Sequence, residues 1–204
     1  MTPEVEAVLA RLHERMAEEQ RQREILSKEE WDAGREARML AIGEEAGRFL
    51  NLLIRAAGAR NLLELGTSVG YSTIWLAEAA RANGGQVTTV DENEHKTRQA
   101  RETLAAAGLA EVVTFITADA VQVCAGQQDL VDFVLLDVWK GVYIPCFEAV
   151  LPKLAVGGLI AADNMTFPVT EQAPLYQARV RGTGGMQSAF VPIGNGFELS
   201  LRVS

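Results

Sequence analysis

Two stretches of the chain end an apolar run with acidic or amide side chains. Asp137 follows the run "FVLL", and Asp163 with Asn164 follows the run "GLIAA". If the two runs are neighbouring parallel strands, their carboxyl ends meet at one edge of a sheet and the three side chains converge. Carboxylate and amide oxygens are the ligands that Mg²⁺ prefers. Together these residues predict a Mg²⁺ site, whereas each acid taken alone could simply cap the next helix.

Two further side chains follow Asp137 closely enough to share this site. Lys140 would have a lowered pKa if it were partly buried there, and a neutral lysine amine can act as a general base. Most lysines lie on solvated loops, so this interpretation depends on the neighbouring acids. Trp139 could stack on an adenine ring, although a tryptophan in the core is the competing interpretation.

A second candidate site lies in the stretch "ELGTSVGYS", from Glu64 to Ser72. Gly66 and Gly70 allow a tight turn and a close approach of a ligand to the backbone. Their GxxxG spacing differs from the GxGxxG of dinucleotide-binding proteins, so the glycines alone are equally consistent with a plain turn. Asp91 ends the next apolar run, where a carboxylate can accept hydrogen bonds from ribose hydroxyls. With Glu64, which is costly to bury unpaired, these residues predict a nucleoside-containing cofactor.

Alternating strands and helices must position these residues. Between residues 61 and 164 short apolar runs alternate with helical stretches, which predicts a parallel sheet covered on both faces. Two later runs flank the turn "GNG" and predict an antiparallel hairpin at the sheet edge. The predicted fold is therefore a mostly parallel α/β sheet of seven strands. These are 61–66, 86–91, 112–119, 130–137, 157–164, 186–194 and 197–203.

The chain before residue 59 is predicted to be helical. Apolar residues recur there at helical spacing in two groups, separated by the charged stretch "EEQRQRE", which is typical of a solvated helix surface. We predict one domain over 1–204, with an N-terminal helical layer at 1–58 and an α/β core at 59–204. The apolar positions are Val5, Val8, Leu9, Leu12 and Met16, and then Met39, Ile42, Phe49 and Leu53.

Composition excludes several other classes of protein. The net charge of −8 and the absence of a Lys/Arg cluster argue against nucleic acid as the main partner. No apolar run is long enough to span a membrane, and the charged N-terminus does not resemble a secretory signal. Cys124 and Cys146 have no metal-ligand spacing, so we expect buried free thiols and a cytoplasmic location.

From about Ile42 onward the motifs resemble a known family. The stretches "LELGTSVGYSTIWLA", "VTTVDEN", "FVLLDVWKGVY", "GGLIAADN" and "PIGNGFELSL" are similar, in order and spacing, to those of cation-dependent, S-adenosylmethionine-dependent O-methyltransferases of the catechol and caffeoyl-CoA types. The resemblance implies a Rossmann-like class I methyltransferase fold and a homodimer. It also implies methyl transfer to a catechol-like, vicinal dihydroxy aromatic molecule. Mg²⁺ would assist, with Mn²⁺ or Ca²⁺ as possible substitutes.

The resemblance also implies roles for individual residues. Asp137, Asp163 and Asn164 would bind Mg²⁺, and Lys140 would be the base. Asp91 would hold the ribose of S-adenosylmethionine. The other cofactor-binding residues would be Ile42, Glu64, Gly66, Ser68, Gly70 and Ser72 toward the methionine part, and Asp119, Ala120 and Trp139 around the adenine.

The chain departs from the family pattern at the acceptor side. Catechol enzymes carry a glutamate that accepts the second substrate hydroxyl, and this chain has Ala189 or a neighbour at that place. Arg38 and Leu40 stand where the family has an aromatic and methionine gate. Both changes argue against catechol itself as the natural substrate.

Two other classes of function stay open. A nicotinamide-dependent oxidoreductase on a related sheet would explain Asp91, but it requires the GxGxxG spacing and leaves Asp137 and Asp163 without a role. A protein that keeps the fold and binds the cofactor without catalysis is the other alternative, because fold alone does not imply function.

Overall fold

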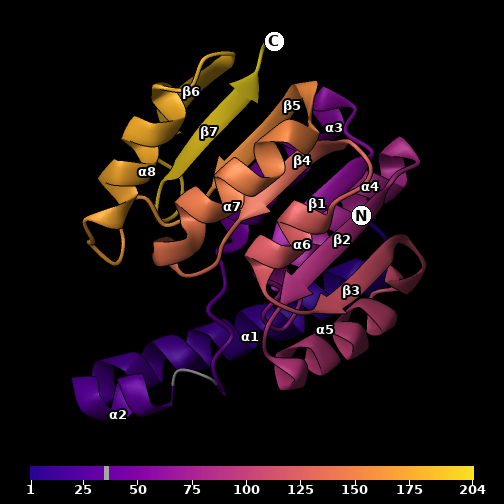
Figure 1. Ribbon diagram of the computed structural model, residues 1–204. Coiled ribbons are helices and arrows are strands. Elements are labelled where there is room, and N and C mark those ends of the chain that lie inside the picture. The colour runs from indigo at the N-terminus through magenta and orange to yellow at the C-terminus, as the bar shows by residue number, and fades with distance from the viewer. Residues whose placement is uncertain (35–36) are drawn as a thin grey trace.

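The computed structural model describes residues 1–34 and 37–204, and a seven-stranded sheet forms its centre. The strand order is β3-β2-β1-β4-β5-β7-β6 (Figure 1). The first five strands in this order are parallel, whereas β7 runs antiparallel to β5 and to β6. The predicted fold class is confirmed. The strands are β1 Asn61–Leu65, β2 Gln86–Asp91, β3 Val113–Thr117, β4 Val131–Leu136, β5 Leu154–Ala162, β6 Met186–Val191 and β7 Phe197–Arg202.

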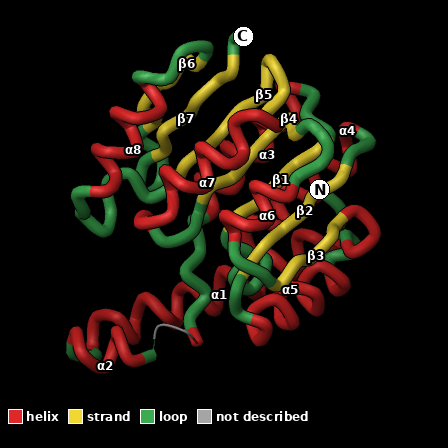
Figure 2. Tube along the Cα trace, in the orientation of Figure 1, coloured by secondary structure: helices red, strands yellow, loops and turns green. Residues whose placement is uncertain are grey.

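Helices cover both faces of the sheet (Figure 2). On one face α1, α3, α4 and α5 pack in one core, and on the other face α6, α7 and α8 pack in a second core. The helices are α1 Pro3–Ile25, α2 Lys28–Ala33, α3 Glu44–Ala57, α4 Tyr71–Asn83, α5 Glu94–Ala106, α6 Ala120–Gly126, α7 Tyr143–Val150 and α8 Gln172–Arg181. Short 3-10 helices occupy Ala110–Val112, Lys140–Val142 and Leu151–Lys153. Of the helices that the structure describes, none is long and apolar enough to cross a bilayer.

The central strand β4 shows why its sequence is apolar at every position from 133 to 136. Side chains alternate across a strand, so Phe133 and Leu135 enter the first core while Val134 and Leu136 enter the second. A parallel strand covered on both faces therefore has no polar side. The polar residues of such a strand are displaced to its ends, which is where Asp137 lies.

The prediction of helix throughout the N-terminal layer is partly wrong. Met39 and Ile42 are buried, but they lie in an irregular segment between α2 and α3. The Glu19 carboxylate accepts the Met39 backbone N–H at 3.1 Å, which ties this segment to α1 and removes it from a helix. In α3 the buried apolar residues are Ala46, Leu50 and Ile54, whereas the predicted Phe49 and Leu53 are partly buried and pack against the same core. Residues 35 and 36 lie outside the described part of this stretch.

Two other element ends are informative. Asn93 caps α5, because its side chain accepts the Lys96 backbone N–H at 3.1 Å. The strand predicted over 157–164 begins earlier, at Leu154. Pairing of Leu154 with Val131 of β4 extends β5 at this end, a contact that local sequence does not reveal.

Candidate active site

The candidate residues lie at the carboxyl ends of four adjacent strands. Leu65 of β1 is in register with Val90 of β2 and with Leu136 of β4, and Leu136 is in register with Ala162 of β5. The residues that follow these positions are therefore side by side at one edge of the sheet. The chain winds outward from β1 to β2 and β3 and, in the other direction, from β4 to β5, so strand order reverses here. Such a switch point is where open α/β sheets bind ligands.

Asp137, Asp163 and Asn164 come together at this edge. The Asn164 amide nitrogen donates to Asp137 Oδ1 at 2.7 Å and lies 3.3 Å from Asp163 Oδ2. Asp163 is 2% exposed, and its Oδ1 is buried without a hydrogen-bond partner among the described residues. Burial raises the pKa of both carboxyl groups, and for Asp137 the nearby charge of Asp163 raises it further. A buried carboxylate beside a half-buried one, with one Asp163 oxygen unpaired among the described residues, is the donor set that a hard divalent cation would stabilise.

The third member of this cluster is an amide. In the described residues no group of three or more His, Cys, Asp or Glu side chains could hold a metal. A site at Asp137 and Asp163 therefore depends on the carboxamide of Asn164, a neutral oxygen donor that suits Mg²⁺ or Ca²⁺. Asn164 adopts a left-handed backbone conformation with φ 61°, which asparagine tolerates better than most residues.

Lys140 begins the 3-10 helix that follows β4, and it is half-buried. Its Nζ donates a hydrogen bond to the Pro168 carbonyl at 2.5 Å, in the loop after Asn164. Burial lowers the pKa of the Lys140 amine, although the charge of Asp163 opposes this effect. A lowered pKa favours the neutral amine, which is the form that can accept a proton.

Gly66 follows β1 and lies against the backbone of Asp137. Its φ is +104°, and a Cβ atom there would be 2.1 Å from the Asp137 carbonyl oxygen. Gly70, at φ +87°, begins α4 and packs on Ala100 and Leu104 of α5. The two glycines therefore allow the loop to touch β4 on one side and α5 on the other.

Substitution of Gly66 by alanine should damage both the fold and the loop. We expect a loss of at least about 1–3 kcal/mol in the free energy of unfolding, since backbone strain is added to a clash with the Asp137 carbonyl. Affinity for S-adenosylmethionine, the predicted cofactor, should fall as well. Urea denaturation and calorimetric titration measure the two effects. Gly126→Ala is the matched control, because a Cβ there meets nothing within 4 Å; equal behaviour of the two variants would contradict the prediction.

Asp91 organises the same loop from the end of β2. Its carboxylate accepts the backbone N–H of Ser68 at 2.8 Å and that of Asn93 at 2.9 Å. Each carboxylate oxygen keeps a further lone pair, so Asp91 can also accept hydroxyl donors. The Ser68 hydroxyl, predicted to contact the cofactor, donates to the Met39 carbonyl and ties the loop to the segment before α3.

Glu64 is fully buried in β1, directly before this loop. Its Oε2 accepts hydrogen bonds from the hydroxyls of Thr73 and Thr89, both at 2.5 Å, while Oε1 is buried without a partner among the described residues. Burial raises the pKa of Glu64 to about 7, and the side chains of Ser72, Thr73 and Thr89 only partly offset this effect. An unpaired oxygen here is available to a cofactor amine, directly or through water.

Glu64 should make the stability of the protein depend on pH. Its pKa is about 7 in the folded chain and 4.5 in the reference state, so from pH 4.5 to 7 the folded chain holds a proton that the unfolded chain has lost. Stability should therefore fall as pH rises through this window, by up to about 1.4 kcal/mol per pH unit, relative to Glu64→Gln. Urea denaturation of both proteins at several pH values measures the difference. A difference that stays constant with pH would contradict the assignment.

The remaining predicted cofactor residues lie around these two loops. Asp119 caps α6 by accepting the Gln122 backbone N–H at 2.8 Å, and the preceding Ala118 N–H donates to the Asp91 carbonyl at 3.2 Å. This places the start of α6 beside Asp91. Trp139 is 64% exposed, so the alternative of a core tryptophan is wrong. The three others, all buried, are Ile42, Ser72 and Ala120.

The predicted acceptor-side residues are dispersed. Ala189 is exposed on the edge strand β6, where it pairs with Leu199. Leu40 is 45% exposed. Arg38 instead stacks on Trp31 of α2, with its guanidinium 3.6 Å from the ring centre. The replacement of the family glutamate by Ala189 or a neighbour stays a prediction.

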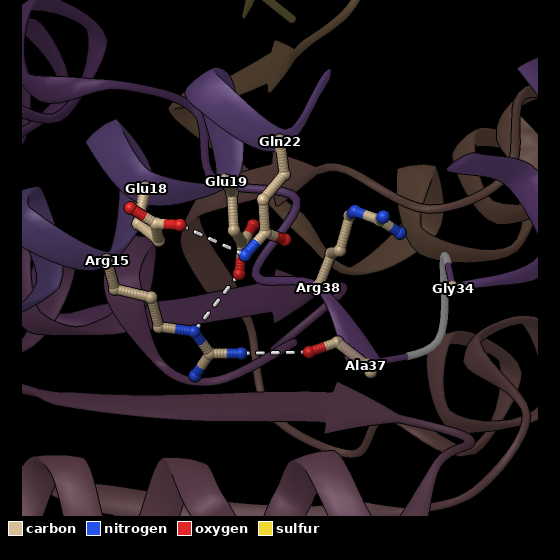
Figure 3. Close-up of a pocket in the computed structure, with 7 residues that line it drawn as sticks. All are labelled: Arg15, Glu18, Glu19, Gln22, Gly34, Ala37 and Arg38. Carbon is tan, nitrogen blue, oxygen red and sulfur yellow. Dashed lines mark hydrogen bonds and ion pairs between the residues drawn. The ribbon is translucent and has the colours of Figure 1, made fainter. Parts of the chain in front are cut away.

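A hollow beside Arg38 has a structural role (Figure 3). Within it Arg15 donates to Glu19 at 3.1 Å and to the Ala37 carbonyl at 2.9 Å, and Gln22 donates to Glu18 at 3.2 Å. The bond from Arg15 to Ala37 fastens the segment before α3 onto α1, and the other two bonds lie within α1. The hollow is thus part of the contact between α1 and the segment before α3. The Met39 carbonyl of that segment accepts the hydrogen bond from the Ser68 hydroxyl.

Sequence reasoning missed Asn195 altogether. Its side-chain amide donates to Asn164 Oδ1 at 3.1 Å, from the turn between β6 and β7. The "GNG" stretch predicted only that turn. No local signal links it to Asn164, which is distant in sequence.

Comparison with known proteins gives this geometry a family context. A family model described as O-methyltransferase matches residues 13–180. A catechol O-methyltransferase of Niastella koreensis is 34% identical over 133 residues, which cover 62% of this chain and 58% of that protein. A caffeoyl-CoA O-methyltransferase of Eucalyptus globulus is 27% identical over 157 residues, which cover 74% of this chain and 61% of that protein. The chain thus spans less than two thirds of the length of these relatives.

A solved structure shows the same architecture. The O-methyltransferase of Streptomyces achromogenes that is involved in tomaymycin synthesis, in complex with SAM, superposes with a TM-score of 0.73 at 25% identity. The superposition covers 84% of this chain and 86% of that one.

Proposed function

The chain belongs to the O-methyltransferase family, and we propose on that basis that it transfers a methyl group from S-adenosylmethionine to a hydroxyl of a vicinal dihydroxy aromatic molecule, with the help of Mg²⁺. The observation that carries this proposal is the contact of Asp137, Asp163 and Asn164 at one edge of the sheet, where Asp163 Oδ1 is buried and has no partner in the part of the chain that the structure describes. A nicotinamide enzyme has no use for such a cluster. Lys140 and the glycine loop, which is predicted to bind the cofactor, lie at the same edge of the sheet.

Different residues of the chain would bind S-adenosylmethionine and Mg²⁺. Asp91 would accept hydrogen bonds from the ribose hydroxyls of S-adenosylmethionine, and Glu64 Oε1 would accept from its amine. S-adenosylmethionine supplies the methyl group, and Mg²⁺ at Asp137, Asp163 and Asn164 would lower the pKa of a hydroxyl bound to it. Lys140 would take the proton of that hydroxyl at its Nζ atom. Holding the two reactants in line is the main contribution of the protein, and correct orientation can contribute roughly 7–11 kcal/mol.

The acceptor is proposed to be aromatic because of a side chain next to these ligands. Phe167 is 62% exposed on the loop that follows Asn164. An exposed large aromatic side chain beside the proposed site suits a flat apolar ligand. The names of the two relatives, catechol and caffeoyl-CoA O-methyltransferase, support the same class. Ala189 in place of the family glutamate favours a phenol other than catechol itself.

Mass spectrometry of reaction mixtures tests this function. The protein is incubated with S-adenosylmethionine, Mg²⁺ and a small panel of catechols, and a parallel arm contains EDTA. Methylated product that disappears with EDTA is the expected result. Product that still forms in the presence of EDTA would show that the reaction does not need the cation. No product in either arm, together with quenching of protein fluorescence by S-adenosylmethionine but not by NADH, would indicate a protein that binds the cofactor without this reaction.

Three further proposals rest on the family resemblance and on packing. Residues 1–204 would form one domain, since Val5, Val8 and Leu9 of α1 lie in the same core as β1 and β4. The protein would act as a homodimer in the cytoplasm, where the buried thiols of Cys124 and Cys146 stay reduced. Mn²⁺ or Ca²⁺ would serve as alternative cations, because both accept the same oxygen donors.

A further inference from the structure

We propose that Asn195 is a positioning residue for the divalent cation, because its side-chain amide decides which atom of the Asn164 amide faces Asp137 and Asp163. The inference rests on the cation site of the proposed function. It assigns a role to the "GNG" turn, which that function leaves unused.

The two amides form a chain of hydrogen bonds that ends on the carboxylates. Asn195 Nδ2 donates to Asn164 Oδ1 at 3.1 Å. Asn164 Nδ2 in turn donates to Asp137 Oδ1 at 2.7 Å and lies 3.3 Å from Asp163 Oδ2. The amide nitrogen of Asn164 thus lies between the acids, and its oxygen points toward Asn195.

A divalent cation requires the opposite orientation of Asn164. A cation binds the amide oxygen and repels the N–H donors, so the Asn164 amide must rotate by half a turn about its terminal bond. Its nitrogen then faces Asn195, where Nδ2 of the unrotated Asn195 would be a second donor. Asn195 must therefore rotate as well and present its Oδ1 as an acceptor. The two amides change together, and Asn195 Oδ1 then accepts from Asn164 Nδ2 and holds the Asn164 oxygen toward the cation.

The backbone holds Asn195 in place for this role. Its carbonyl oxygen accepts from the backbone N–H of Thr166 at 2.9 Å and from the Thr166 hydroxyl at 2.7 Å. The next carbonyl, that of Gly196, accepts the Met165 N–H at 3.0 Å. Gly194 and Gly196 both have positive φ, at 58° and 79°, so the turn can lie flat against the segment that follows β5. Backbone hydrogen bonds thus hold the turn of Asn195 against the segment that follows Asn164, which keeps the two side-chain amides in contact.

Two substitutions of Asn195 separate positioning from general damage. Asn195→Leu keeps the size of the side chain and removes every hydrogen bond. Asn195→Asp keeps only acceptors, so it should pair with Asn164 Nδ2 and hold the Asn164 oxygen toward the acids. A side chain that orients a metal ligand typically changes metal affinity 10–100-fold when it is lost.

Calorimetric titration with Mn²⁺, in the absence of substrate, is the decisive measurement. We expect Asn195→Leu to bind Mn²⁺ roughly 10–100-fold more weakly than the wild type, and Asn195→Asp to bind at least as tightly as the wild type. Affinity for S-adenosylmethionine, titrated without the cation, should be unchanged in both variants. Asp137→Ala, which should abolish the signal, verifies that the titrated site is this one.

The outcomes distinguish the inference from the function on which it rests. If the wild type does not bind Mn²⁺ at a site that Asp137→Ala removes, the cation site fails and the inference fails with it. If the wild type binds but Asn195→Leu binds equally well, the inference alone is overturned. Equal weakening by Asn195→Leu and Asn195→Asp would also overturn it, because the acceptor would then have no special value.

Discussion

Replacement of Asp137 by alanine should abolish methyl transfer and divalent-cation binding, while affinity for S-adenosylmethionine stays within a few-fold of the wild type. Asp137 supplies one of the two carboxylates of the proposed cation site, and the cofactor is expected at Glu64, Asp91 and the glycine loop. The Asp137 backbone carbonyl lies against Gly66 of that loop, and alanine keeps this backbone contact. We would measure product formation, Mn²⁺ binding and cofactor binding on one protein preparation. These measurements test whether Asp137 serves the cation and not the cofactor.

The same variant should remain folded. Burial and the neighbouring charge of Asp163 raise the pKa of Asp137 above its ordinary 3.8, so the stability of the wild type falls as the pH rises from that ordinary value toward the raised one. Removing the Asp137 carboxyl should leave the free energy of unfolding unchanged or higher at pH 8 without a cation. A loss of cofactor affinity equal to the loss of cation affinity would show that Asp137 supports both ligands and would contradict the separation of the two sites.

Replacement of Lys140 by methionine should lower kcat by roughly 10²–10⁴-fold, the usual contribution of a general base. Cation and cofactor affinities should change little, because the Lys140 amine contacts the Pro168 carbonyl and none of the proposed ligand atoms. In the wild type kcat should rise with pH as the amine loses its proton, and burial should move this rise below the ordinary pKa of lysine. The methionine variant should lack that dependence. Steady-state kinetics from pH 6 to about 10 measure both effects.

Two controls make this result specific. Lys153→Met removes a lysine at the opposite end of the sheet, where its amine donates to the Gln128 carbonyl at 3.2 Å, and it should leave kcat unchanged. Lys140→Arg keeps the positive charge but cannot act as a base near neutral pH. Activity retained by Lys140→Arg would mean that Lys140 acts through its charge, and the role of general base would be wrong.

Much of the core could be predicted because its signals are local. The stretch predicted as the first helix of the α/β core is α4, Tyr71–Asn83, and it lies between Gly70 and Gly84, both with left-handed backbone. The Asn93 side chain caps α5 by accepting the backbone N–H of Lys96, three residues further along the chain. Apolar runs of strand length between such helices leave few alternatives to a parallel sheet. The acids at their ends were predicted to lie together for the same reason.

Long-range contacts explain where prediction failed. Helical spacing at Met39 and Ile42 was misleading, because Glu19 on α1 accepts the Met39 N–H and holds the segment in an irregular conformation. The early start of β5 depends on the pairing of Leu154 with Val131. Arg38 was expected near the acceptor, but Trp31 of α2 provides a stacking surface for it.

By itself, the sequence determined the order of strands and helices, the family, and the residue types at each strand end, since each of these follows from neighbours a few positions apart. Only the tertiary structure decided how those residues are used. Burial leaves one oxygen of Glu64 and one of Asp163 without partners among the described residues, and thereby defines two sites that could accept a ligand. The orientation of the Asn164 amide is likewise set by Asn195, 31 residues further along the chain, because a side-chain hydrogen bond depends on distance in space and not on distance in sequence.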